Sequence, residues 1–271
     1  MKTDNIHYIT PERLSLACVE HIVESGAAIA LSDKSLELIA RCRDYLDAKV
    51  ASDSAPIYGV TTGFGSLCNI SVSSDQLGQL QRNLVMSHAC GVGETVAPEI
   101  VKLMLLLKVQ SLSYGNSGVQ PVTVQRLVDF YNNDVIPVVY SQGSLGASGD
   151  LAPLANMCLP LLGLGEVLWQ GRQVPAAEVL QHYGWEPIAL QSKEGLALLN
   201  GTQFMSAHAV AALISARRLW KAAASIGAMS LDAFDGRIEP FGPQVNAVRH
   251  HRGQIETAEV FRNLLRGSEL I

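Results

Sequence analysis

The stretch from Glu99 to Tyr114 is apolar on nearly every side, and it constrains the fold more than any other part of the chain. A helix whose apolar residues surround its axis is stable only when other elements cover it all round. Pro98 suits the first position of this helix, and the GNSG sequence at 115–118 suits its end. The sequence therefore predicts a mainly α-helical protein with this helix in the middle of a bundle.

Apolar residues recur at helical spacing through most of the remaining chain. The segment Glu166–Pro175 instead alternates around Gln170 and Gly171, which predicts one small peripheral β-hairpin. The glycine-rich stretch 57–69 has no periodic face and is predicted to be an ordered loop. Further helices are expected from the Thr10 and Pro11 pair to Gly26, from Ser32 to about Val50, from Ser74 to about His88, over 121–132, as one or two helices over 193–233, and over 257–271.

Charge and composition argue against several classes of function. The net charge is −5, and lysines and arginines are scattered, so no basic surface for nucleic acid is expected. The N-terminus lacks a basic start followed by an apolar core, and the longest apolar run is too short to cross a bilayer. We therefore expect a soluble, cytoplasmic protein with no membrane partner.

The cysteines and histidines give no support for a metal site. The cysteines are odd in number, contain no CxxC pair and suit reduced thiols. His250 and His251 are adjacent, and neighbours on a helix cannot face one ion together, so a solvated surface is expected there. The five cysteines are Cys18, Cys42, Cys68, Cys90 and Cys158.

The sequence GSLGASGDLAPL at 143–154 places three small residues, Ala147, Ser148 and Gly149, before an expected helix. Residue types alone favour a tight turn in which Asp150 caps that helix. The same residues also allow backbone cyclisation, because only glycine brings an unhindered amide nitrogen close enough to attack the Ala147 carbonyl. Loss of the ring water and of the Ser148 hydroxyl would leave a conjugated methylene, an electrophile that ordinary side chains do not supply.

This stretch resembles the signature of the aromatic amino acid ammonia-lyases, whose prosthetic group 4-methylideneimidazol-5-one (MIO) is made from Ala-Ser-Gly. The resemblance implies the helical N-terminal domain of the ammonia-lyase fold, with MIO formed from Ala147, Ser148 and Gly149 and with no metal or nucleotide. Similar blocks cover essentially the whole chain: YGVTTGFG at 58–65, QRNLVMSHACGVG at 81–93, KEGLALLNGTQ at 193–203 and RGQIETA at 252–258.

The resemblance also implies roles for three further residues. Tyr58 would be the base, which requires helix N-termini or cations to stabilise its phenolate at neutral pH. His88 would recognise an imidazole ring of the substrate, and Asn200 would hydrogen-bond the substrate or the prosthetic ring. On residue types alone, a packed tyrosine, a histidine at a helix end and a polar residue before Gly201 are the more ordinary interpretations.

The pair Ser87 and His88 bears on the substrate. Histidine-selective members of the family carry serine-histidine here, whereas relatives selective for phenylalanine or tyrosine usually carry an aromatic-leucine or histidine-leucine pair. The resemblance thus implies elimination of ammonia from L-histidine to give urocanate. Alternatives are a lyase or aminomutase acting on tyrosine or phenylalanine, and a non-catalytic helical module. Thr61 stands where the family more often has asparagine, and little effect is expected from it.

Family members are longer than this chain and form homotetramers whose active sites take residues from downstream segments and from neighbouring subunits. We therefore expect residues 1–271 to form one N-terminal MIO-bearing domain that ends before or within the central helical bundle. The chain by itself is expected to be inactive, whereas the full-length protein is expected to be a homotetramer acting on a small amino acid. Whether the native chain continues past Ile271, and whether MIO forms in this portion, stay open.

Overall fold

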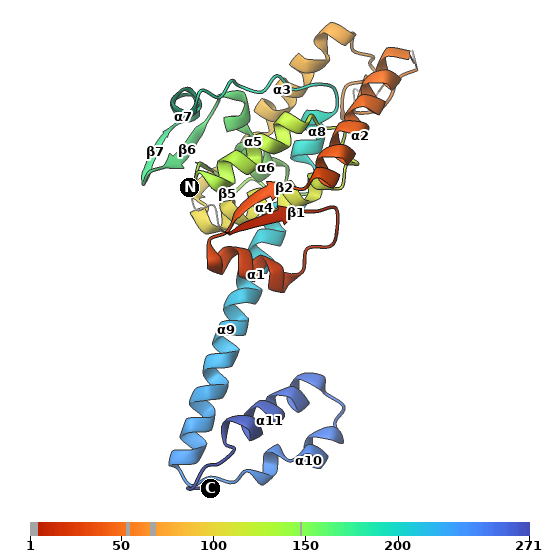
Figure 1. Cartoon of the computed structure of the whole chain (residues 1–271). Helices are drawn as coiled ribbons and strands as arrows, with labels where there is room; N and C mark the ends of the chain where they lie inside the picture. Colours follow the sequence, from red (N-terminus) through yellow and green to blue (C-terminus); the bar gives the residue numbers. More distant parts are fainter. Residues whose placement is uncertain (1–4, 53–54, 66–68, 147) are drawn as a thin grey trace. The chain divides into compact units, whose positions relative to one another are not determined.

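The computed structural model describes residues 5–52, 55–65, 69–146 and 148–271, which fold mainly into α-helices as predicted (Figure 1). The chain divides into two compact units, one up to Val210 and one over Ala211–Ile271. The first unit contains α1 (Leu16–Ser25), α2 (Asp33–Ser52), α3 (Leu77–His88), α4 (Pro98–Ser113), α5 (Pro121–Asn132), α6 (Leu151–Cys158), α7 (Ala176–Tyr183) and α8 (Glu194–Leu199). The long helix α9 (Gln203–Ala233) begins in the first unit and continues into the second, where α10 (Pro243–Ala247) and α11 (Arg252–Leu264) follow.

The helix α4 is the centre of the first unit, as its all-round apolar sequence predicts. Met104, Leu105, Leu106 and Val109 are fully buried, although they point to different sides of the helix. Helices α5 and α2 and two short strands contact α4, and the helices can be followed in Figure 1. The prediction of a buried central helix is therefore confirmed.

The N-terminal segment differs from the expected helix. Residues Ile6–Ile9 form β1, which pairs in parallel with β2 (Ala28–Leu31). The helix α1 begins only at Leu16, where the Ser15 hydroxyl accepts a hydrogen bond from the Cys18 amide at 3.2 Å. The prediction of a helix start at Thr10 and Pro11 was wrong, because the chain leaves β1 at Ile9 and the Thr10 and Glu12 carbonyls accept hydrogen bonds from the Gln110 side chain of α4, at 3.0 Å each.

The predicted hairpin is confirmed and belongs to a larger sheet. Its strands are β6 (Glu166–Trp169) and β7 (Arg172–Pro175), and both turn residues have a positive φ, 49° at Gln170 and 74° at Gly171. A third strand, β4 (Ile136–Pro137), pairs with the other edge of β6. A separate ladder joins β3 (Val92–Thr95) to β5 (Tyr140–Gln142), directly before the 143–154 segment.

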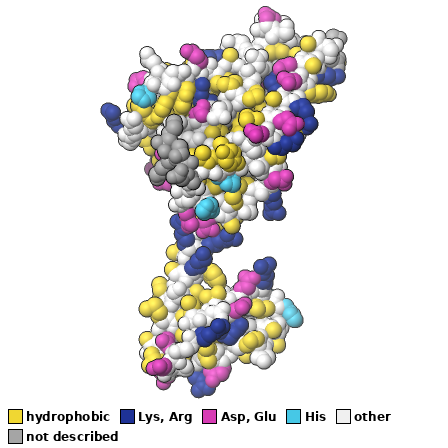
Figure 2. Space-filling model, viewed as in Figure 1, with side chains coloured by type: hydrophobic (Ala, Val, Ile, Leu, Met, Phe, Trp, Pro, Cys, Tyr) yellow, Lys and Arg dark blue, Asp and Glu magenta, His cyan; other side chains and the backbone are white. Residues whose placement is uncertain are grey.

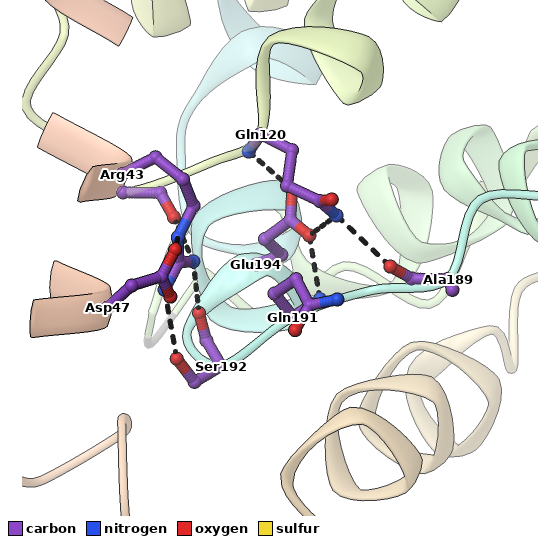
Figure 3. Close-up of polar contacts among 8 residues, drawn as sticks. Arg43, Asp47, Gln120, Ala189, Gln191, Ser192 and Glu194 are labelled. Atoms are coloured by element: carbon purple, nitrogen blue, oxygen red, sulfur yellow. Dashed lines mark hydrogen bonds and ion pairs between the residues drawn. The ribbon is translucent and has the colours of Figure 1, made fainter. Parts of the chain in front are cut away.

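The short helix α8 is anchored at its N-terminal end by the Glu194 side chain, which is fully buried (Figure 3). Its Oε1 accepts hydrogen bonds from the Gln120 amide at 2.8 Å and from the Thr123 hydroxyl at 2.7 Å. Its Oε2 accepts from the Gln191 amide at 2.7 Å and from Gln120 Nε2 at 2.6 Å. Four donors thus satisfy one buried carboxylate and tie α8 to the start of α5.

A buried arginine from α2 reinforces the same region. Arg43 Nη1 donates to the carbonyl oxygen of Gly118 at 2.7 Å and to that of Ser192 at 2.9 Å. Its Nε and Nη2 pair with the carboxylate of Asp47, one turn further along α2 (Figure 3). The guanidinium therefore joins α2, the loop before α5 and the segment before α8 through groups that would otherwise be buried without partners.

The second unit has a small core of its own. The rings of Phe241 and Phe261 stack at 4.6 Å between centroids, and Asn246 Nδ2 donates to the carbonyl oxygens of Pro240 and Gly242. The expected helix over 257–271 is α11, which begins earlier, at Arg252, and ends at Leu264. Large apolar side chains that are at least half exposed in this unit are Leu213, Leu219, Ile226, Met229, Phe234, Val245, Val248 and Leu270.

On the face shown in Figure 2, acidic side chains are interspersed among basic ones. His250 and His251 are exposed, as expected for a solvated surface. Across the described residues, none of the helices combines the length and the apolar character that crossing a membrane requires.

The Glu194 network predicts a stability effect. In Glu194→Gln one carboxylate oxygen becomes an NH₂ group, which cannot accept from the buried donors that face it. The free energy of unfolding should therefore fall by about 2 kcal/mol. Denaturant unfolding measures this change. The matched control Glu178→Gln, at an exposed position on α7, should shift it by less than about 0.5 kcal/mol. Equal stability of the Glu194 variant and the wild type would contradict the analysis.

Candidate functional site

The structure brings three of the predicted site residues, His88, Ser148 and Gly149, to one pocket of about 130 Å³. His88 is the last residue of α3, whereas Ser148 lies in the turn before α6. Cys90 also lines the pocket with an exposed thiol, and the sequence analysis did not assign it to the site. The remaining wall comes from the segment around Ser148, namely Gly143, Leu145, Gly146, Leu151 and Ala152.

The backbone around Ser148 reverses direction sharply. An antiparallel bridge joins Gly146 to Gly149, which closes a tight turn, and Ala147 lies outside the described residues. Gly149 has a φ of 87°, and a Cβ there would lie 2.2 Å from the carbonyl oxygen of Gly201. Both the backbone conformation and the close packing therefore require glycine at this position.

Asp150 occupies the N-cap position of the helix beginning at Leu151, as predicted, but its side chain makes no capping hydrogen bond there. Asp150 is buried, and its Oδ2 accepts a hydrogen bond from the Met205 amide at 3.0 Å, in the first turn of α9. Its own amide donates to the carbonyl oxygen of Gly201 at 2.8 Å. Because the backbone of the Ser148 turn lies against the chain after α8, the carboxylate reaches the helix start that is near in space and not the one next in sequence.

The His88 ring is oriented by its own helix. Its Nδ1 lies 2.8 Å from the carbonyl oxygen of Leu84, which can only accept, so Nδ1 carries the proton in this contact. The Ser87 hydroxyl lies beside the same nitrogen and donates to the same carbonyl at 3.1 Å. In the neutral imidazole with the proton on Nδ1, the other ring nitrogen, Nε2, is an acceptor. A half-buried imidazole of this kind can bind an N–H or O–H donor.

Tyr58 and Asn200 do not line this pocket, but both are attached to α8. The Tyr58 ring is 58% exposed and packs edge-on against Phe64. The next residue, Gly59, packs so closely on α8 that a Cβ there would lie 2.6 Å from Leu196. Asn200 directly follows α8, and its Nδ2 donates to the carbonyl oxygen of Leu196 at 3.1 Å. Within the described chain, no cation or hydrogen-bond donor contacts the Tyr58 hydroxyl.

A buried lysine to which the sequence analysis gave no role contacts the backbone of Asn200. Lys108 of α4 is 1% exposed, and its Nζ donates to the carbonyl oxygens of Ala197 at 2.8 Å and Asn200 at 3.3 Å. Burial lowers the pKa of Lys108 to about 8. It also raises the pKa of the nearby Cys158 thiol to about 12, so that thiol supplies no negative charge. A lysine inside an all-round apolar helix was the available sequence signal, since a buried ammonium must find acceptors.

The described residues contain no group of three or more histidine, cysteine, aspartate or glutamate side chains that could hold a metal ion. Cys18, Cys42, Cys90 and Cys158 are free thiols, and Cys68 lies outside the described residues.

The lowered pKa of Lys108 predicts a pH-dependent stability. Between about pH 8 and its ordinary pKa of 10.5, this lysine is neutral when folded and charged when unfolded. The unfolded state then binds more protons, so the free energy of unfolding rises with pH in this window, and below pH 8 this group adds no slope. The free energy of unfolding of the wild type, minus that of Lys108→Met, should therefore rise by about 1 kcal/mol from pH 8 to pH 9 in denaturant titrations. A difference that stays constant would contradict the assignment.

Comparison with known proteins agrees with the motif resemblance. The family model described as aromatic amino acid lyase matches residues 14–271. Histidine ammonia-lyases of Legionella pneumophila and Burkholderia mallei are each 44% identical over 262 residues, which is 97% of this chain and 52% of the relative. The chain thus spans about half the length of these curated relatives.

Solved structures agree in fold. A tyrosine aminomutase from Streptomyces globisporus superposes with a TM-score of 0.90 at 35% identity, covering 97% of this chain and 49% of that one. A histidine ammonia-lyase from Trypanosoma cruzi gives 0.86 at 36%, covering 95% and 50%. The family model matches residues 14–271 of this chain, and the helical fold is shared with these solved structures. This chain therefore belongs to the aromatic amino acid lyase family.

Proposed function

We propose that this chain carries the electrophilic centre of an enzyme that eliminates ammonia from L-histidine to give urocanate. The observation that carries the proposal is the pocket shared by Ser148 and His88. Its lining includes both the residue from which the electrophile would form and a histidine whose ring can recognise an imidazole N–H. The named relatives, histidine ammonia-lyases, support the same substrate.

The residues present fit the prosthetic group MIO. Its formation joins the Gly149 nitrogen to the Ala147 carbonyl carbon and releases two waters, the second from the Ser148 hydroxyl and α-hydrogen. A tight reversal between Gly146 and Gly149, and a glycine with no room for a Cβ, meet the requirements of such a ring closure. When present, MIO supplies an electron-poor methylene that activates the amino acid for loss of ammonia.

The other residues of the chain would bind and orient the substrate and move its proton. The Nε2 atom of His88 would accept a hydrogen bond from the substrate imidazole, with Ser87 and Leu84 keeping the ring in the required tautomer. Tyr58 would take the β-proton, and the carboxamide of Asn200 would hold the amino acid or the ring. These last two roles rest on the motif resemblance together with the attachment of both segments to α8.

A tyrosine lyase or aminomutase is the second candidate. A neutral Nε2 atom on His88 can accept a phenol O–H as readily as an imidazole N–H, and tyrosine aminomutase is among the solved structures with a TM-score of 0.90. The electrophile would be the same, and only the recognised ring would differ. For either substrate, the proposal keeps the homotetramer that the motif resemblance implies and the cytoplasmic location expected from the sequence.

The proposal predicts the mass of the protein. The intact wild-type chain should weigh less than its sequence by two waters and should react with borohydride. Gly149→Ala should keep its full sequence mass, because a Cβ collides with Gly201. Ser148→Ala should be inert to borohydride, since no methylene can form, whereas the exposed neighbour Ser144→Ala should behave as wild type. An unchanged wild-type mass would overturn the proposal.

Substrate choice can be tested without turnover, by the protection that a bound amino acid gives against borohydride. L-histidine should protect the wild type at concentrations about tenfold lower than those needed for His88→Leu, because the variant lacks the acceptor nitrogen. Gln79→Leu, on an exposed part of α3, is the matched control and should resemble wild type. Protection by L-tyrosine but not by L-histidine would favour the second candidate.

A further inference from the structure

Lys108 has no role in the chemistry outlined above, yet it is among the largest fully buried side chains of the protein. Its hydrogen bonds go to backbone carbonyls, and no carboxylate pairs with it in the described part of the chain. Burying an ammonium in this way costs free energy that an apolar side chain of similar size would not cost. Stability alone therefore does not account for a lysine here. Its role depends on the two carbonyl groups that it holds, those of Ala197 and Asn200.

Both acceptors lie at the C-terminal end of α8. The last carbonyls of a helix have no partner within the helix, and this end carries the negative end of the helix dipole. The Lys108 ammonium satisfies the carbonyls of Ala197 and Asn200 at that end. A helix of six residues has little stability of its own. The orientation of its last turn therefore depends on this contact.

The contact lies one peptide unit away from the Ser148 turn. The carbonyl of Asn200 and the nitrogen of Gly201 belong to the same planar peptide group, so a donor that holds the carbonyl also orients the plane. The next carbonyl, that of Gly201, accepts from the Asp150 amide at 2.8 Å and is the group against which Gly149 packs. Lys108 thus holds the peptide group between Asn200 and Gly201, and the Gly201 carbonyl in turn contacts the Ser148 turn.

We propose that Lys108 is a positioning residue of the proposed lyase site, holding the Asn200 to Gly201 backbone so that it supports the Ser148 turn and presents the Asn200 carboxamide. This inference rests on the proposed function for its biological meaning. Its physical content is independent of MIO: the amide of Asp150 stays protected only while Lys108 holds the acceptor segment.

Hydrogen exchange at single amides of the purified protein tests the inference. In Lys108→Met the amide of Asp150 should exchange about tenfold faster than in wild type, since loss of a hydrogen bond from a charged donor frees the segment. The amide of Ser32, which donates to Ile9 at 3.0 Å, is the internal reference and should not change. Lys102→Met, at a partly exposed position of the same helix, is the matched control and should leave both amides unchanged.

The outcomes separate positioning from general destabilisation. Equal acceleration at Asp150 and Ser32 would mean that Lys108 only stabilises the fold, and this would overturn the inference, as would an unchanged Asp150 amide. Should Lys108→Met fail to fold, Lys108→Gln serves instead, because its shorter, neutral side chain cannot reach both carbonyls, and the same two results decide. Lys108→Arg retains a cationic donor and should restore part of the protection.

Failure of this inference and failure of the proposed function are distinguishable. A wild-type chain without the loss of two waters overturns the proposed function, and the exchange comparison still decides whether Lys108 holds the turn. If the wild type does show that loss, the fraction of dehydrated chain should fall several-fold in Lys108→Met relative to Lys102→Met, because the turn is then less often in the closing geometry. An equal fraction in both variants would overturn the inference.

Discussion

Two buried charges of opposite sign, one at each end of α8, are the interaction on which the candidate site depends. The Glu194 carboxylate collects four donors at the first turn, and the Lys108 ammonium collects two carbonyls at the last. Each charge stands at the end of the helix where its sign complements the dipole. A helix of six residues gains little from its own hydrogen bonds, so the surrounding core, reached through these side chains, determines where it lies.

Several segments that are distant in sequence converge on this short helix. The loop that carries Tyr58 packs on Leu196 through Gly59, and the Gln81 side chain of α3 accepts from the Leu196 amide. The Ser148 turn rests on Gly201, directly after the helix. Loops are generally the mobile parts of a protein, and positioning of reacting groups requires that they be held within a fraction of an ångström. In this chain α8, held at both ends by Glu194 and Lys108, contacts all three segments, directly or through Gly201.

Local sequence patterns predicted the elements whose cause is local. The helices α4 and α5 follow from apolar spacing and from an initial proline, and the β6–β7 hairpin follows from alternation around Gln170 and Gly171. The strands β1, β3, β4 and β5 have two to four residues each, too few for a periodic signal, and their partners are remote in sequence. The side-chain partner of Asp150 was not predicted for the same reason, since Met205 is 55 residues away. The shared pocket of His88 and Ser148 likewise required the fold, because motif resemblance names residues but not distances.

The crowding at Gly149 has a consequence for how the history of such chains can be traced. Packing against Gly201 demands glycine at this position whether or not a ring is ever made. A descendant that had abandoned the chemistry would still keep this glycine for steric reasons, so its retention says nothing about activity. Position 148 is different, because its side chain is exposed and the turn places no comparable limit on it. In a chain released from selection for the chemistry, Ser148 would therefore be substituted first, while Gly149 would be kept because of its packing.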